Sequence, residues 1–280
     1  MEISKFVNIY KKMNKDLSHY IDELLAQGRH HFTTAELEKA KLSVSERSLP
    51  VSLSRLAKKG KIKMIKRGFG IILGPGGHYI DPSFYIDALM NFLGAKYYVA
   101  LLTAAGRWGA SHQASMAYQI ITDKVVYPVT LGVGRLQFIT KKDTFPEKAI
   151  ERVTGEGGYF LVSSPELTAI DLLRFPKVSG HLSNIATVLD DLVEKWDGRK
   201  MISLCHDSKV PTVTLQRLGF ILDKILNYHE EAEYVLKALV KRKISKAILS
   251  NAKKNLNLIR SEMQFDEKWQ LFINTKVEPD

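Results

Sequence analysis

Basic side chains crowd the segment 47–67, which contains no aspartate or glutamate. Lysine and arginine neutralise the phosphates of a nucleic acid, and arginine and serine can also hydrogen-bond to base edges in the DNA major groove. We therefore expect a DNA-contacting surface here. Its candidate residues are Arg47, Ser52, Ser54, Arg55, Lys58, Lys59, Lys61, Lys63, Lys66 and Arg67. A basic face that contacts only solvent is the alternative, and charge alone does not decide between the two.

Two other groups of residues have side chains that can react or bind metals, but their spacing does not favour a catalytic or metal site. Cys205, His206 and Asp207 have the residue types of a nucleophilic site, but adjacent residues are poorly placed to converge on one point. We expect Cys205 to be a small core residue and His206-Asp207 to mark a helix boundary. The pair His30-His31 has no third ligand at metal-binding spacing.

Glycine-rich segments at 74–77 and 155–158 lack the Lys-Ser/Thr pair of a phosphate-binding loop. We interpret both as turns. From the sequence we therefore expect no catalytic residue, no metal site and no cofactor. We expect that the protein is not an enzyme.

The chain is long enough for two domains, with 280 residues of which 45% are hydrophobic. Its net charge is +11, and residues 1–80 alone carry 15 Lys and Arg against 7 Asp and Glu. We expect a DNA-binding domain over residues 1–80 and a second domain over 81–280.

The single cysteine excludes an internal disulfide, and neither a signal peptide nor a run of about 20 apolar residues is present. These features predict a cytoplasmic protein with no membrane partner.

Helix signals in the first domain begin with an apolar stripe over residues 16–27. Thr33 and Glu36 have the spacing of a capping box, in which each would bond the backbone N–H of the other, and Phe32 and Leu37 that of a hydrophobic staple. A second helix is therefore expected to run to about residue 41.

A third helix is expected after Ser48 or Leu49, with Pro50 in its first turn, and Gly60 would end it. We expect four of its side chains, Val51, Leu53, Leu56 and Ala57, to face inward. The alternating segment 61–67 and the segment 71–72 predict a two-stranded hairpin. Three helices followed by a hairpin make a winged helix-turn-helix, whose third helix would lie in the major groove.

The second domain is expected to be mixed α/β and mainly helical, giving an α+β chain. The expected helices are 82–93, 96–108, 164–175, 184–196, 213–226 and 229–242, and the expected strands are 125–130, 136–140, 160–162 and 269–274. Ser164 is expected to cap the helix that starts there, with Pro165 in its first turn. A basic run near the C-terminus, Lys241, Arg242, Lys243, Lys246, Lys253 and Lys254, is interpreted as a solvated helix face. An extended nucleic-acid surface is the alternative.

Several segments, in this order and spacing, resemble the AbiEi-type antitoxins of bacterial type IV toxin–antitoxin (abortive infection) systems. They are RLAKKGKI (55–62), KRGF (66–69), YYVALLTAA (97–105), GASHQ (109–113), SPELTAIDLLRFP (164–176), QRLGFILD (216–223) and WQLFIN (269–274).

The resemblance implies a transcriptional repressor that binds inverted repeats in its own promoter through the N-terminal winged helix. It also implies a C-terminal antitoxin domain, and a nucleotidyltransferase-like toxin as functional partner, without stable direct binding. Two alternatives stay open. One is an interaction protein whose winged helix and C-terminal domain bind the toxin directly. The other is an RNA-binding or nucleotide-modifying enzyme, which would need a cluster of buried acids within residues 80–280.

Overall fold

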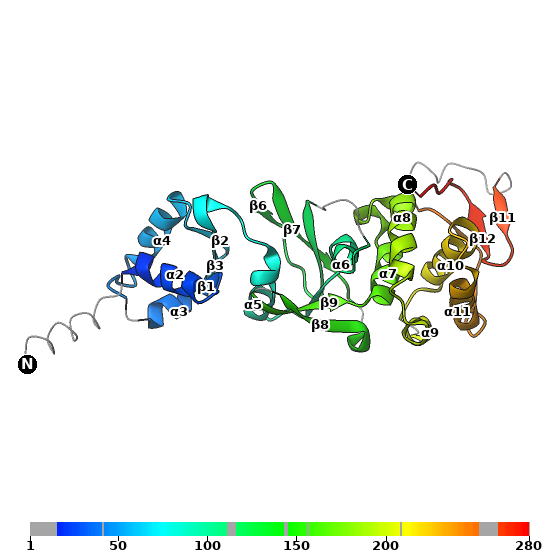
Figure 1. Cartoon of the computed structure of the whole chain (residues 1–280), viewed down its shortest axis with the longest axis horizontal. Coiled ribbons are helices and arrows are strands. Elements are labelled where there is room, and N and C mark those ends of the chain that lie inside the picture. Colours follow the sequence, from blue (N-terminus) through cyan, green and yellow to red (C-terminus); the bar gives the residue numbers. More distant parts are fainter. Residues whose placement is uncertain are drawn as a thin grey trace, which may run out of the picture. The chain divides into compact units, whose positions relative to one another are not determined.

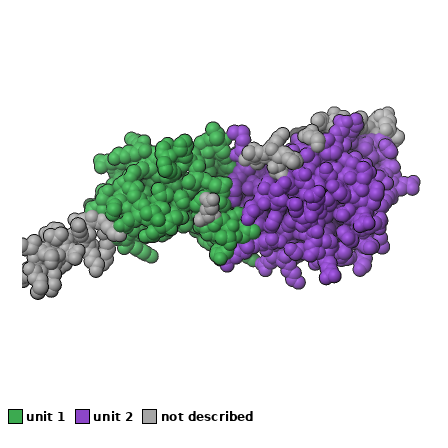
Figure 2. Space-filling model, in the orientation of Figure 1, with its two compact units in different colours: residues 1–96, 128–136, 153–160 green, residues 97–127, 137–152, 161–280 purple. Residues whose placement is uncertain are grey.

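The computed structural model has a mixed α+β architecture (Figure 1). It describes residues 16–40, 42–110, 116–142, 145–155, 157–207, 209–251 and 263–279. The chain divides into two compact units, coloured separately in Figure 2. Unit 1 comprises residues 1–96, 128–136 and 153–160, and unit 2 comprises residues 97–127, 137–152 and 161–280. The domain boundary at residue 80 stays a prediction.

From residue 16 onward, the described part of unit 1 starts with three helices around one apolar core. The helices are α2 (Leu17–Ala26), α3 (Thr34–Lys39) and α4 (Leu49–Lys58). The core contains Leu17, Ile21, Leu24, Phe32, Leu37, Leu49, Leu53, Leu56, Ile62 and Ile72. Helices α2 and α4 each contribute three residues at helical spacing to this core, and α3 contributes Leu37.

A small antiparallel sheet completes this part of unit 1. Its strands are β1 (His31–Thr33), β2 (Ile62–Lys66) and β3 (Phe69–Ile72), in the order β1-β3-β2. The β2–β3 hairpin was expected, and β1 was not, because three residues are too few to show an alternating pattern. A Cβ atom at Gly70 would lie 2.3 Å from the Phe32 ring, so glycine is required where β3 crosses that side chain.

The next segment of unit 1 was predicted as one helix over 82–93. It is a 3₁₀ turn (Pro82–Phe84) followed by helix α5 (Ile86–Phe92). The Asp81 carboxylate caps the turn by accepting from Ser83 N at 2.8 Å.

A six-stranded sheet follows, with order β6-β7-β5-β4-β9-β8. Its strands are β4 (Tyr97–Val99), β5 (Ala117–Thr122), β6 (Val129–Leu131), β7 (Gly134–Thr140), β8 (Ile150–Gly155) and β9 (Gly158–Ser163). Strand β4 pairs antiparallel with β5 and parallel with β9. Strands β5 and β8 were not predicted, and most of the expected strand 125–130 precedes β6.

The expected helix over 96–108 is wrong in its first half. Residues 97–99 form β4, and the helix α6 spans only Leu101–Arg107. The segment is apolar on every side, so its periodicity did not distinguish a buried strand from a buried helix. Two tyrosines and a valine, which favour strands, occupy the part that is extended.

Helices make up most of the rest of unit 2. They are α7 (Pro165–Arg174), α8 (His181–Val193), α9 (Gly198–His206), α10 (Thr212–Phe220) and α11 (His229–Leu239), with a π-helical turn at Ile221–Ile225. Helix α9 was not expected from the sequence. None of the helices in the described parts of the chain is long and apolar enough to span a bilayer.

The last element is a small sheet of order β10-β12-β11. Its strands are β10 (Ala247–Ile248), β11 (Gln264–Asp266) and β12 (Leu271–Ile273). Gln216 of α10 donates from Nε2 to the backbone oxygen of Trp269 at 3.0 Å, which ties this sheet to the helices.

Candidate nucleic-acid interface

Helix α4 is fixed by a narrow apolar stripe. Leu49, Leu53 and Leu56 are buried in the core of unit 1, where they pack with residues of α2 and α3. Ser48 lies at the N-cap, but its hydroxyl bonds to Ser45 Oγ at 2.8 Å rather than to the helix N-terminus. The stripe leaves the opposite face of α4 exposed.

The preceding helix, α3, is positioned by its own cap. Thr33 Oγ1 accepts from Glu36 N at 3.2 Å, as predicted. The Glu36 carboxylate, which was expected to return to Thr33, instead forms a two-point ion pair with Arg29 and accepts from Tyr20 Oη at 3.3 Å. Burial alone would raise the pKa of Glu36, but the Arg29 hydrogen bonds and charge outweigh it, so the pKa is lowered.

The exposed face of α4 carries four side chains at helical spacing: Val51, Ser54, Arg55 and Lys58. Positions i, i+3, i+4 and i+7 lie along one side of a helix. Val51 was expected to be buried and is 52% exposed. Ala57, also expected inside, is exposed as well. The buried stripe is filled by three leucines, which leaves no inward position for either residue.

Other candidate residues flank this face. Arg47 precedes α4 and Lys59 is its C-cap, and both are exposed, whereas Ser52 is half-buried. Lys61 has an acidic partner: its Nζ lies 2.9 Å from Asp22 Oδ2, and it also donates to Ser18 Oγ at 3.0 Å. A phosphate at Lys61 would therefore compete with a carboxylate on α2.

Three candidates lie on the β2–β3 hairpin. Lys63 Nζ lies 5.3 Å from the centroid of the Tyr79 ring, a cation–π distance. Lys66 is half-buried, and this burial lowers its pKa. Arg67 is exposed beside Gly68, whose φ of 86° allows the tight turn. The hairpin thus presents basic side chains next to α4 in the same unit.

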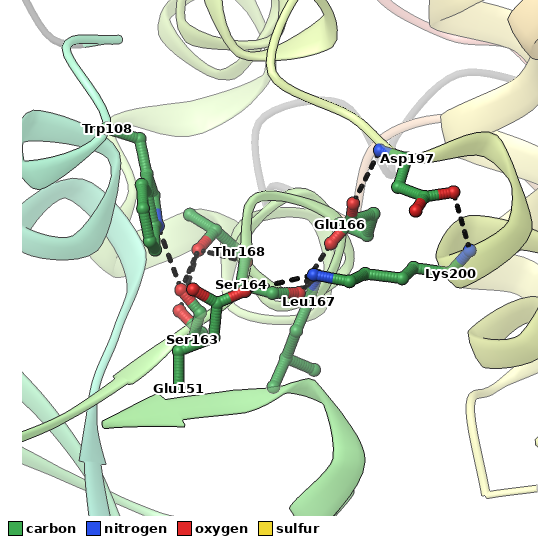
Figure 3. Close-up of polar contacts among 9 residues, drawn as sticks. All are labelled: Trp108, Glu151, Ser163, Ser164, Glu166, Leu167, Thr168, Asp197 and Lys200. Carbon is green, nitrogen blue, oxygen red and sulfur yellow. Dashed lines mark hydrogen bonds and ion pairs between the residues drawn. The ribbon is translucent and has the colours of Figure 1, made fainter. Parts of the chain in front are cut away.

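Unit 2 contains a buried polar cluster at the start of α7 (Figure 3). Ser164 Oγ caps α7 by accepting from Leu167 N at 3.3 Å, which confirms the predicted cap. Glu166 is buried, and its carboxylate accepts from Ser164 Oγ at 2.6 Å and from Asp197 N at 2.7 Å. Glu166 therefore links the start of α7 to the start of α9 through Oε1, while Oε2 bonds within the cap of α7.

Two further acids of unit 2 are also buried and have partners. Asp171 accepts from Tyr98 Oη at 2.7 Å and lies 3.3 Å from Lys141 Nζ. Asp223 lies 2.9 Å from His229 Nδ1 and accepts from Trp269 Nε1 at 2.9 Å. The described residues contain no group of three histidines, cysteines or acids placed to hold a metal ion. The absence of enzymatic activity stays a prediction.

The C-terminal basic run contains one arginine with a structural role. Arg242 donates to the backbone oxygens of Val210, Cys205 and Asp207. Lys241, Lys243 and Lys246 are exposed, but they follow the end of α11 at Leu239, so the expected helix face is wrong for them. Lys253 and Lys254 lie outside the described residues. Cys205 is fully buried, and burial raises the pKa of its thiol to about 12. His206 ends α9 and Asp207 follows it, so both predictions for this segment are confirmed.

Two segments of the chain match models of known protein families. Residues 19–69 match a model described as "Transcriptional regulator, AbiEi antitoxin", so unit 1 contains a domain of the transcriptional-regulator type. Residues 98–224 match the "AbiEi antitoxin C-terminal domain". The chain belongs to the AbiEi antitoxin family.

A solved structure supports the fold. The RV2827C protein from Mycobacterium tuberculosis is similar to this chain with a TM-score of 0.64 and 17% identity, over 91% of this chain and 90% of that one. No curated protein matches the chain.

Proposed function

We propose that this protein is the antitoxin of a type IV toxin–antitoxin system and a DNA-binding repressor of its own operon. The observation that carries the DNA-binding half is the exposed face of α4, with Ser54, Arg55 and Lys58 outward and three leucines inward. The match of residues 19–69 to a transcriptional-regulator model supports the same function.

In this proposal residues 1–80 act as a winged helix-turn-helix. Helices α3 and α4 are the helix-turn-helix pair, and the β2–β3 hairpin is the wing. Helix α4 enters the major groove of double-stranded DNA, as the second helix of such pairs does. The target is an inverted repeat in the protein's own promoter.

Three groups of residues divide the contacts. Ser52, Ser54 and Arg55 read base edges, and Arg47, Lys58, Lys59 and Lys61 bind phosphates beside the helix. On the wing, Lys63, Lys66 and Arg67 anchor the backbone or the minor groove. Exposed Arg55 has the reach for a two-point contact to guanine, which contributes about 1–3 kcal/mol of discrimination.

Residues 81–280 provide the antitoxin activity, without catalysis, in the bacterial cytoplasm. The partner in function is a nucleotidyltransferase-like toxin that is not held in a stable complex. The full pairing of Glu166, Asp171 and Asp223 with neighbouring groups favours structural roles for these acids over catalytic ones.

A fluorescence anisotropy titration tests the DNA-binding half. The full chain is titrated onto duplex DNA from upstream of its gene, at two salt concentrations, with random duplex as competitor. Tight binding that resists the competitor is expected. Binding no tighter than to the random duplex would overturn the repressor assignment.

The antitoxin half is tested by co-expression with the neighbouring toxin gene. Growth should be restored by the wild-type chain and also by Arg55→Ala, because the proposed antitoxin activity lies in residues 81–280. Failure of the wild-type chain to restore growth would refute this half. Recovery of a stable complex of the two proteins would instead favour direct binding of the toxin.

A further inference from the structure

Val51 is the apolar member of an otherwise polar, basic stripe on α4. The stripe continues through Ser54, Arg55 and Lys58, and Val51 lies in the first turn with half of its surface exposed. Single exposed valines are common on protein surfaces, and Val125 and Val240 are examples here. The position of Val51 on this face separates it from them.

The first turn of a recognition helix reaches deepest into the major groove. An isopropyl group there can neither donate nor accept a hydrogen bond. The apolar group that DNA presents in the major groove is the C5-methyl of thymine. We infer that Val51 reads a thymine methyl group, an inference that rests on the proposed DNA-binding function.

The surrounding charge identifies DNA as the occupant of this face. Arg55 lies one turn after Val51 and Lys58 lies two turns after it, so positive charge follows the valine along the same side of the helix. A partner protein would have to place acidic groups in register beside an apolar patch, whereas a duplex supplies phosphates, guanine edges and thymine methyl groups together.

The spacing of Val51 and Arg55 along α4 also predicts how far the thymine lies from the guanine. Four residues along a helix advance about 6 Å, and base pairs are stacked about 3.4 Å apart. With α4 lying along the groove, the thymine read by Val51 lies about one or two base pairs from the guanine bound by Arg55.

The test begins with selection of a binding site by the full chain from a random duplex library. Each thymine of the selected site is then replaced by deoxyuridine, which removes only the methyl group. At one thymine position per half-site, this replacement should lower the affinity of the protein for the duplex about fourfold, which is the effect of losing one buried methyl-sized group. Val51→Ala should bind the thymine and deoxyuridine duplexes equally well.

Val240→Ala is the matched control, because it makes the same change at a valine that is 76% exposed in unit 2. It should keep the wild-type preference for thymine. A selected site with no sensitivity to deoxyuridine, or a sensitivity that persists in Val51→Ala, would overturn the Val51 assignment and leave DNA binding intact. Failure to select any sequence would overturn both.

Discussion

The indole ring of Trp269 lies directly against Gly219, so closely that a Cβ atom on the glycine would come within 1.9 Å of a ring carbon. The same indole donates from Nε1 to the carboxylate of the buried Asp223 at 2.9 Å. Gly219 and Asp223 are one helical turn apart, which gives the ring a notch and a hydrogen-bond acceptor on the same side. This contact joins the C-terminal sheet to the helices of unit 2.

Gly219→Ala should therefore destabilise unit 2. The added methyl group overlaps the ring, and overpacking of this kind costs about 1–3 kcal/mol. Urea denaturation measures the change in the free energy of unfolding. Gly74→Ala is the control, since its nearest neighbour would lie 3.5 Å from the new Cβ. Equal stability of the Gly219→Ala variant and the wild type would contradict the packing described.

Lys141→Met should cost more than a surface substitution. Lys141 and Asp171 are 5% and 0% exposed, and Tyr98 Oη donates to Asp171 and accepts from Lys141 Nζ at 3.1 Å. Burial and Asp171 raise the pKa of Tyr98 well above its usual range, so it stays protonated as a donor. Removing the ammonium leaves a buried carboxylate uncompensated, which costs about 3–5 kcal/mol.

Denaturation of a double-substitution cycle checks this value. Lys141→Met combined with Asp171→Asn should regain part of the lost stability, because the uncompensated charge is gone. Lys142→Met, at the exposed neighbouring position, should be close to neutral. A double variant less stable than Lys141→Met alone would refute the electrostatic explanation.

The burial of His31 should make the folded chain less stable in mild acid than at neutral pH. Burial, aided by the charge of Arg29, lowers the pKa of His31 to about 4, and its ring stacks on Phe69. The unfolded chain binds a proton at this histidine below about pH 6.5, and the folded chain does not until about pH 4. The free energy of unfolding should fall as the pH decreases through that window.

Urea denaturation of His31→Phe between pH 7 and pH 4 tests this assignment. The variant should lose less stability over this interval than the wild type. His78→Phe, at an exposed histidine, controls for the loss of an imidazole. The same pH dependence in His31→Phe and the wild type would show that another group is responsible.

Arg55→Ala and Lys59→Ala should weaken DNA binding in different ways. Arg55→Ala should lose more affinity for a selected site than for random duplex, because arginine contacts to guanine carry sequence information. Lys59→Ala should weaken both alike and make the slope of log K against log salt less steep by about 0.9. With about five phosphates neutralised, the wild-type slope should be about −4 to −5. Anisotropy titrations across a salt series give both quantities, and equal losses on both duplexes for Arg55→Ala would refute base reading.

The sequence was informative where local rules decide the structure. The cap of α3 at Thr33, the cap of α7 at Ser164 and the burial of Leu53 and Leu56 in α4 follow from local spacing, and each is found. The basic segment 47–67 was also visible, because charge is a property of composition. These features depend on residues a few positions apart.

Contacts between distant segments were decided by the tertiary structure alone. Asp22 and Lys61 are 39 residues apart, so their ion pair could not be read from spacing. Residues 97–99 become a strand because β5 and β9 supply hydrogen-bond partners on both sides. Val51 is exposed because Leu49, Leu53 and Leu56 already fill the buried side of α4. A hydrophobic side chain is buried only where the fold has room for it, and the sequence by itself does not specify that room.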